Sequence, residues 1–380
     1  MFKSPNKKIL FIGHSSKVGG AQKVLADVIN SLSSQSNYEC HVVCPNFQGN
    51  SFENLLEKRN LFFFNYLPFI SNSSSSIKHI LGIILNLPVL FYLIWYVINN
   101  RINIIYINSS TNFVGIILSS ITRVRTILHV HEQNNSSIKI IPNYIKFFYK
   151  YFVKSEFLVK IIFPSKMTQK SWENFLDTSF FNGDKLYAPI YIEEFNRTGK
   201  SDIFTIGFVG SLFNEKNIFT LLYAFLNLLN LNSTKAIKLK IVGAGPLKED
   251  ILKFAKKNDV SQNIIVLDHL TFHSEIYSDM SVLVQPSFME SWSLVSAEAL
   301  FYKIPLVISN KSGITEILTD KTDSLFFNPL DADALVKCLN LLLNDLNLSE
   351  RIAIAGFENI RSLNLNYIFK QEICSIINNA

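Results

Sequence analysis

The chain has 380 residues, of which 48% are hydrophobic and 17% are charged. This length suits two domains, and the apolar content is enough for a core in each of them, which excludes an intrinsically disordered chain. The four cysteines form no CxxC pair and no Cys/His cluster, which excludes a disulfide framework and a four-ligand zinc site. We therefore expect a reducing compartment, and residues 1–20 do not have the pattern of a secretion signal.

The net charge of +6 is unevenly distributed along the chain. Residues 1–195 contain 19 Lys and Arg against 11 Asp and Glu, whereas the remainder contains 17 against 19. A one-sided positive field indicates an anionic partner such as phosphate, a membrane surface or nucleic acid. Nucleic acid is not expected, because no recognised binding module accompanies the charge.

Short runs rich in Ile, Val and Phe alternate with helical patterns along almost the whole chain, which is typical of parallel βαβ units. The expected strands are 8–12, 40–44, 104–108, 126–131 and 159–164 in the first half, and 204–209, 239–242, 264–268, 282–285 and 305–309 in the second. These two series predict an α/β protein with two Rossmann-like domains. The polar segment 192–201 separates them, so we expect the domains at 1–195 and 196–365, followed by a last helix at 366–380.

Two glycine turns follow expected strands. Gly19 and Gly20 precede a helix whose first N–H groups could meet a diphosphate, although a plain strand-to-helix turn explains them equally well. The turn at 242–246 could open a dinucleotide site, but Lys248 stands where the fingerprint needs its third glycine. An NAD or FAD site is therefore disfavoured.

Two glutamates flank the amino end of one expected helix. Glu290 lies in the loop after the strand at 282–285, and Glu298 lies about two turns into the helix that follows. Parallel sheets bind ligands at this edge, and a carboxylate on an apolar helix needs a partner, for which sugar hydroxyls are suitable donors. A pair of capping or solvent-facing glutamates is the alternative.

The surroundings of these glutamates resemble a known family. Pro286 and Ser287 precede Glu290, and Leu294-Val295 precede Glu298 in an E-x7-E motif. Further matching motifs lie at 19–22, 209–217, 243–247, 304–307 and 313–317. In this order they resemble the retaining nucleotide-sugar glycosyltransferases of family 4, strongly over 204–330 and more loosely over 8–200. The resemblance implies the GT-B fold, in which two Rossmann-like domains face each other across a donor-binding cleft. It also implies that the last helix, at 366–380, crosses back to the first domain.

The resemblance also implies roles for single residues. Glu298 would accept hydrogen bonds from the nucleotide's ribose, Glu290 would contact the donor sugar near the reacting carbon, and Lys216 would neutralise the diphosphate. The other implied donor contacts are the backbone N–H groups of Ser293, Leu294 and Val295, the glycine loop of Gly19 and Gly20, and a sugar-pocket histidine, His131. For His131, an ordinary core or surface histidine is the alternative.

The chain departs from the family pattern at several positions. Ser211 stands where an arginine is usual, so one of two phosphate-binding cations is missing. Ser293 and Lys303 each stand where a glycine is usual. Both glutamates are present, so we expect activity to be retained.

Two segments raise the question of a membrane. Residues 80–98 are uncharged and long enough to span a bilayer, but Asn86 and Pro88 interrupt them, so burial or shallow insertion is favoured over spanning. Lysines 146, 150 and 154 recur every four residues, with aromatic residues elsewhere on the same expected helix. This pattern fits a helix lying on an anionic membrane, or equally an aromatic core face with a lysine edge.

These observations predict a retaining, hexosyltransferase-type enzyme that moves a sugar from a nucleotide-diphosphate donor such as a UDP-sugar to a saccharide or lipid-linked acceptor. Its process would be cell-surface polysaccharide or glycolipid biosynthesis, and its location cytoplasmic, peripheral to the inner face of the plasma membrane. No cofactor besides the donor and no catalytic metal are expected, because no Asp-x-Asp pair lies in a plausible phosphate-binding loop. A non-catalytic nucleotide-sugar or saccharide-binding protein is the main alternative, and a dinucleotide oxidoreductase is a third.

Overall fold

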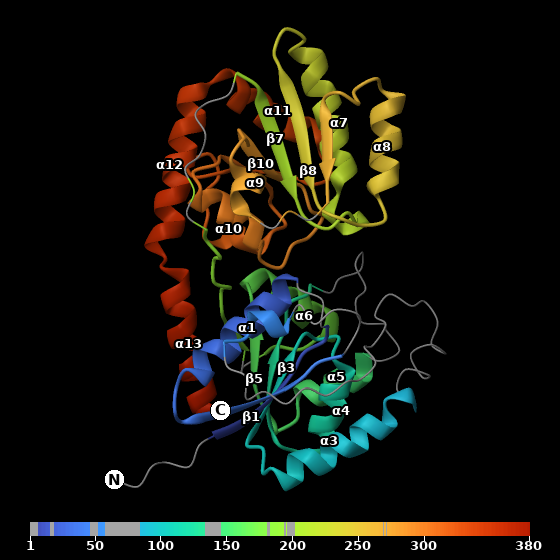
Figure 1. The fold of residues 1–380 in the computed structure, drawn as a ribbon, viewed down its shortest axis with the longest axis vertical. Helices are drawn as coiled ribbons and strands as arrows, with labels where there is room; N and C mark the ends of the chain where they lie inside the picture. The colour runs from blue at the N-terminus through green and yellow to red at the C-terminus, as the bar shows by residue number, and fades with distance from the viewer. Residues whose placement is uncertain are drawn as a thin grey trace. The chain divides into compact units, whose positions relative to one another are not determined.

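The computed structural model describes residues 7–15, 19–45, 52–57, 84–133, 146–180, 183–193, 195, 202–268, 270 and 272–380. The chain divides into two units, one of Met1–Pro189 with Asn366–Ala380 and one of Ile190–Leu365. Each unit is an α/β structure in which helices pack on a parallel sheet (Figure 1). The division falls a few residues before the sequence boundary at 195.

The first unit contains a six-stranded sheet in the order β2-β1-β3-β4-β5-β6, all neighbours being parallel. Its strands are β1 Lys7–Ile12, β2 Tyr38–Val43, β3 Ile104–Asn108, β4 Arg125–His129, β5 Leu158–Phe163 and β6 Gly183–Lys185. Its helices include α1 Gly20–Ser33, α3 Leu87–Asn99, α4 Phe113–Thr122, α5 Lys146–Val153, α6 Lys166–Leu176 and α13 Leu365–Asn379, with a short 3-10 helix, η1, at Glu53–Leu55. Every residue of β3 is buried, as expected for a strand covered on both faces.

Helix α13 belongs to the first unit although it ends the chain. The Lys7 ammonium donates to the carbonyl oxygens of Ile377 and Asn378 at 3.1 and 3.0 Å, and the Tyr38 hydroxyl donates to the Asn378 side chain at 2.6 Å. These bonds attach the last turn of α13 to the first residues of β1 and β2.

The second unit contains another six-stranded parallel sheet, in the order β12-β11-β10-β7-β8-β9. Its strands are β7 Phe204–Val209, β8 Ile237–Val242, β9 Ile264–Leu267, β10 Val282–Gln285, β11 Leu306–Ser309 and β12 Leu325–Phe327. Its helices include α7 Ile218–Leu231, α8 Lys248–Lys257, α9 His273–Tyr277, α10 Leu294–Phe301, α11 Ala332–Asn344 and α12 Leu346–Ser362, with short 3-10 helices η3 at Asn214–Lys216 and η4 at Gly313–Glu316. This strand order is that of a dinucleotide-type Rossmann sheet.

All ten expected strands are present, and the two-domain α/β prediction is confirmed. The sequence prediction missed β6 and β12, which have three residues each. Such short strands carry too little periodicity to be recognised.

The apolar segment before β3 forms α3 from residue 87 onward, and residues 80–83 lie outside the described ranges. Leu93 and Val97 are buried, whereas Phe91 and Trp95 are more than half exposed. Helix α3 is thus partly buried and presents an apolar outer side. Within the described ranges, no helix has the length and hydropathy that crossing a bilayer requires.

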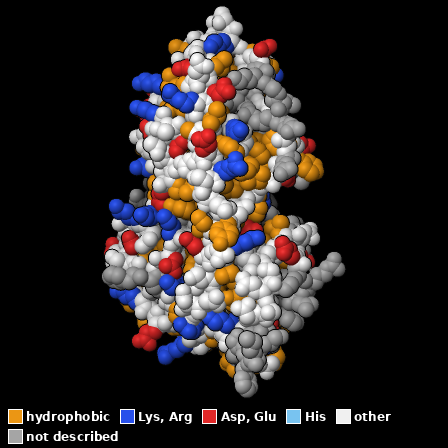
Figure 2. All heavy atoms as spheres, turned by 90° about the vertical axis from the view of Figure 1, so that its left-hand side faces the viewer, with side chains coloured by type: hydrophobic (Ala, Val, Ile, Leu, Met, Phe, Trp, Pro, Cys, Tyr) orange, Lys and Arg blue, Asp and Glu red, His pale blue; other side chains and the backbone are white. Residues whose placement is uncertain are grey.

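Helix α5 carries Lys146 and Lys150 of the expected lysine stripe, whereas Lys154 follows its last residue. Residues 138–145 before it lie outside the described ranges. Its aromatic residues do not form one face, because Tyr149 is buried whereas Phe147 and Tyr151 are exposed. Among the described residues on the face that Figure 2 shows, basic and acidic side chains are interspersed. These residues therefore form no single-sign surface there.

Candidate active site

The candidate site of the second unit lies where the strand order of its sheet reverses. Strands β7 and β10 are neighbours. The strand that follows β7, β8, lies toward one edge of the sheet, and the strand that follows β10, β11, lies toward the other edge. In open parallel sheets, ligands bind beyond the carboxyl ends of the two strands at such a point. Lys216 follows β7 and Glu290 follows β10, so both lie in the loops that this rule selects.

Lys216 is held in place by a turn that is bonded to the β10 loop. The buried Asn217 side chain donates to the carbonyl oxygens of Pro286 at 3.0 Å and Pro329 at 2.8 Å. The Phe288 N–H donates to the Glu215 carbonyl oxygen at 3.1 Å. The position of Lys216 relative to Glu290 is therefore determined by several buried backbone and amide contacts.

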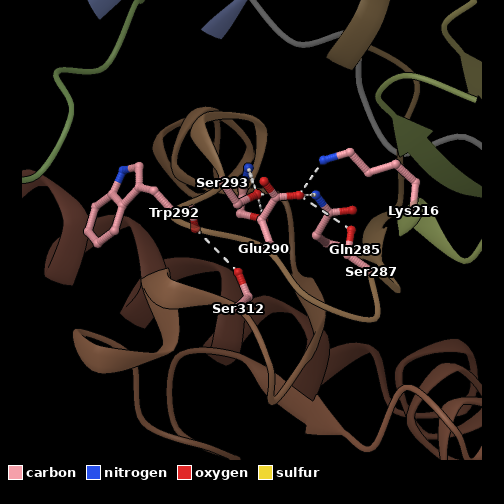
Figure 3. A network of polar contacts seen from close by, with 8 residues as sticks. Lys216, Gln285, Ser287, Glu290, Trp292, Ser293 and Ser312 are labelled. Carbon is pink, nitrogen blue, oxygen red and sulfur yellow. Dashed lines mark hydrogen bonds and ion pairs between the residues drawn. The ribbon is translucent and has the colours of Figure 1, made fainter. Parts of the chain in front are cut away.

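The Glu290 carboxylate is the centre of a polar network (Figure 3). Its Oε2 atom pairs with the Lys216 ammonium and accepts hydrogen bonds from Gln285 Nε2 at 3.2 Å and Ser287 Oγ at 3.3 Å. The two side chains that the sequence assigned to the donor's sugar and diphosphate are thus brought together as an ion pair.

The first residue before α10 has an unusual backbone conformation. Ser293 has φ 94° and ψ 81°, in the left-handed region that favours glycine. The strain is offset locally, because Ser293 Oγ accepts hydrogen bonds from the Ser296 N–H at 3.3 Å and from Gln285 Nε2 at 3.3 Å. Lys303, the other position where the family pattern has glycine, also has a positive φ, of 55°. Glycine suits both positions for the same backbone reason.

Glu298 is buried on α10 and is bonded to a tyrosine of α9. The Tyr277 hydroxyl donates to Glu298 Oε2 at 2.7 Å. Burial raises the pKa of Tyr277 well above its ordinary value, and the neighbouring Glu298 carboxylate raises it further, so the phenol stays protonated and remains a donor. The sequence prediction did not include Tyr277.

The glycines at 243 and 245 serve close backbone packing. A Cβ atom on Gly243 would lie 1.8 Å from the Gly210 carbonyl oxygen, and one on Gly245 would lie 2.5 Å from that of Leu212. The Leu212 N–H donates to the Ala244 carbonyl oxygen at 2.9 Å. This turn thus supports the loop that contains Ser211, at the carboxyl end of β7.

The remaining sequence candidates belong to the first unit. Its sheet reverses between β1 and β3, and the exposed Gly19 and Gly20 follow β1 at the start of α1. His131 follows β4, and its Nε2 donates to Asn108 Oδ1 at 2.7 Å, the tautomer being assigned from this acceptor. Burial lowers the pKa of His131 to about 4, so its imidazole is neutral at pH 7.

Glu132, beside His131, is a partly buried acid that the sequence prediction missed. Its carboxylate accepts hydrogen bonds from the hydroxyl groups of Ser109 and Ser110. Burial raises its pKa, but His14, His131 and the serine hydrogen bonds outweigh this and hold the pKa below its ordinary value. Ser109 and Ser110 directly follow β3, and this pair of hydroxyls was the only sequence signal for the contact.

Comparison with known proteins finds a family match within the second unit. The family "Glycosyl transferases group 1" matches residues 192–359. The capsular polysaccharide biosynthesis glycosyltransferase CapM of Staphylococcus aureus is 24% identical over 182 residues, 47% of this chain and 47% of CapM. The GalNAc-alpha-(1->4)-GalNAc-alpha-(1->3)-diNAcBac-PP-undecaprenol alpha-1,4-N-acetyl-D-galactosaminyltransferase of Campylobacter jejuni is 26% identical over 171 residues, 45% of this chain and 46% of that protein. The chain thus spans about half the length of these curated relatives.

The solved structures extend the likeness to the whole chain. The crystal structure of Anabaena HepE in complex with UDP-glucose is 17% identical, with a TM-score of 0.78 over 98% of this chain and 100% of HepE. At this identity the likeness shows the fold, which is the GT-B fold of two Rossmann-like domains. Residues 192–359 are thus similar to the group 1 glycosyl transferases, and the chain as a whole has the GT-B fold.

Proposed function

We propose that this protein is a retaining glycosyltransferase that moves a hexose from a UDP-sugar to a saccharide or lipid-linked acceptor in polysaccharide or glycolipid biosynthesis. The observation that carries the proposal is the placement of Lys216 and Glu290 after the two strands where the sheet reverses. Two similar proteins support it, since CapM acts in capsular polysaccharide biosynthesis and HepE was crystallised with UDP-glucose.

The proposed chemistry uses charges that the chain itself supplies. The bond between the sugar's anomeric carbon and the diphosphate breaks while a bond to the acceptor oxygen forms on the same face, and the departing phosphate oxygen takes the acceptor's proton. Lys216 and the backbone N–H groups of Leu294 and Val295 would stabilise the negative charge that develops on the diphosphate. We propose that no catalytic metal takes part.

The first unit has groups of its own that suit a nucleotide sugar. The backbone N–H groups of Gly19 and Gly20, at the exposed start of α1, can bind a phosphate. The neutral imidazole of His131 can form a hydrogen bond to a sugar hydroxyl without placing a charge beside it.

Turnover of nucleotide sugars by the purified protein tests this function. UDP-glucose is the first donor to offer, followed by other UDP-sugars, with release of UDP and formation of a glycoside as the readouts. We expect turnover that EDTA does not abolish and a product whose anomeric configuration matches that of the donor. Binding without turnover would support the alternative of a non-catalytic binding protein, and an inverted product would contradict the retaining mechanism.

The serine that replaces an arginine leads to a gain-of-function prediction. Ser211→Arg would add a cation at the end of β7, and we expect UDP to bind more tightly by about 1 kcal/mol, the upper value for a solvent-screened charge pair. Calorimetric titration with UDP at low and high salt measures the change, which should shrink as salt rises. Ser211→Ala is the matched control with no added charge, and weaker UDP binding by the arginine variant would indicate a different role for Ser211.

We also propose that the protein binds the inner face of the plasma membrane peripherally, through its first unit. The exposed Phe147 and Tyr151 of α5 lie beside the lysines of the same helix, a combination that suits an anionic lipid surface. Lys146 and Lys150 both form ion pairs with Asp177, at 2.9 and 3.1 Å, which reduces the positive charge that they can offer to lipid.

Co-sedimentation with lipid vesicles tests the membrane proposal with variants of opposite sign. Replacing Lys146, Lys150 and Lys154 with Glu should release the protein from vesicles that contain phosphatidylglycerol, since each basic residue near such a surface contributes about 1 kcal/mol. Asp177→Ala should strengthen vesicle binding, because it removes the carboxylate that pairs with Lys146 and Lys150. High salt should weaken the binding of wild type and of Asp177→Ala. Equal sedimentation of all three with phosphatidylcholine and phosphatidylglycerol vesicles would refute the electrostatic contribution.

A further inference from the structure

Gln285, the last residue of β10, is buried at 4% exposure within the Glu290 network. Its Nε2 donates to Glu290 Oε2 at 3.2 Å and to Ser293 Oγ at 3.3 Å. The carboxylate determines the orientation of the amide, because the opposite orientation would place the amide oxygen against a carboxylate oxygen. Gln285 thus joins Glu290 to the residue that caps α10.

The other end of the same amide is unpaired. Gln285 Oε1 is buried and has no hydrogen-bond partner among the residues that the structure describes. Figure 3 shows this oxygen pointing away from Glu290. A buried acceptor without a donor is unfavourable, and such atoms in folded proteins usually have a partner. Because Gln285 ends the strand beside the reversal point of the sheet, a bound ligand can provide the missing donor.

We propose that Gln285 is a positioning residue for Glu290 and that its Oε1 accepts a hydrogen bond from a hydroxyl of the donor sugar. This inference rests on the proposed function, because it needs a sugar beside Glu290. When Lys216 turns from Glu290 toward a diphosphate, Gln285 and Ser287 continue to donate to Glu290 Oε2. The carboxylate then keeps its orientation while its cation is engaged elsewhere.

Gln285→Met tests both contacts, because methionine has a similar length but neither the N–H donor nor the carbonyl acceptor. We expect kcat with the accepted UDP-sugar to fall about tenfold or more, while the Kd for UDP, which has no sugar, changes little. Gln262→Met is the matched control, since Gln262 is exposed and lies before β9. Equal losses of kcat and UDP affinity would indicate a general disturbance of the site and overturn the positioning role.

Gln285→Glu gives a pH-dependent readout that a purely structural role would not give. The introduced carboxyl has nearly the same shape but faces Glu290 with an oxygen instead of an N–H group. Ionised, it repels Glu290; protonated, it can donate to Glu290 as the amide does. We expect the activity of this variant relative to wild type to rise as the pH falls from 8 to 5.5. A relative activity that is independent of pH would contradict the positioning role.

A series of UDP-glucose analogues, each lacking one hydroxyl, tests the sugar contact. We expect one analogue to bind wild type more weakly than UDP-glucose does. The same analogue should bind Gln285→Met about as tightly as UDP-glucose binds that variant, as in a double-mutant cycle. If every analogue loses affinity equally in wild type and variant, Oε1 has no sugar contact and that half of the proposal is wrong. Wild type that binds and turns over no UDP-sugar would instead overturn the proposed function and this inference with it. A working wild type whose Gln285→Met variant behaves like Gln262→Met would overturn the inference alone.

Discussion

Replacing Glu298 with alanine is expected to weaken UDP binding about tenfold to a hundredfold, because hydrogen bonds to a charged group contribute about 1.5–3 kcal/mol. Glu298 is buried on α10, and a ribose would provide the hydroxyl donors that a buried carboxylate requires. Titration of UDP by calorimetry gives the change in Kd.

The ribose assignment has its own controls. Tyr277→Phe removes the phenol that donates to Glu298 Oε2 at 2.7 Å, so it should weaken UDP binding less than Glu298→Ala does. For a UDP analogue that lacks both ribose hydroxyls, both variants should have nearly the same affinity as wild type has for this analogue. Thermal unfolding of each variant reports whether the buried network is disturbed. A deoxy analogue that binds both variants far more weakly than it binds wild type would place Glu298 outside ribose recognition.

Most of the fold could be predicted because short stretches of sequence indicate its strands and helices. Buried parallel strands such as β1, β3 and β7 are continuous apolar runs, and the helices between them cover both faces of the sheet. The short strand β6 has the sequence Gly-Asp-Lys and depends on its pairing with β5, which no local pattern reveals. Helix α13 was expected to return to the first domain from the resemblance to a family, since its own sequence does not specify where it docks.

In the candidate site, too, some residues could be recognised from local sequence and others could not. Glu290 and Glu298 were found from their spacing and surroundings, whereas Tyr277 acts on Glu298 from α9, across 21 residues of sequence. Gln285 stands five residues before Glu290 but has no chemical signature of its own, because its role depends on how its amide is turned. Contacts of this kind arise from tertiary packing and need the structure.

The positions that depart from the family pattern show why the departures are tolerated. Ser293 adopts a left-handed conformation that costs an L residue roughly 1–3 kcal/mol, and its side chain caps the Ser296 N–H of α10 in return. A serine can therefore replace the glycine without loss of the helix start. Ser211 has no comparable compensation for the charge of an arginine, so the diphosphate would depend more heavily on Lys216.

That dependence leads to opposite expectations for the two glutamates. Glu290→Ala should lower kcat about a hundredfold, because the contact near the reacting carbon matters most in the transition state. UDP should bind this variant no more weakly than wild type, and slightly more tightly, because Lys216 is released from its ion pair with Glu290. Glu298→Ala has the reverse pattern, with its main effect on UDP affinity.

The coupling between Lys216 and Glu290 can be measured separately from either single effect. Lys216→Ala should weaken UDP binding, and Glu290→Ala in that background should leave UDP binding unchanged or improve it, since it removes a carboxylate that no longer has its lysine. Non-additivity of UDP affinities in this double-mutant cycle gives the strength of the ion pair. Glu249→Ala, an exposed glutamate of α8, is the matched control and should change neither kcat nor UDP affinity. If Glu290→Ala weakens UDP binding as strongly as Glu298→Ala while kcat is preserved, the roles of the two glutamates must be exchanged, with Glu290 on the nucleotide and Glu298 on the sugar.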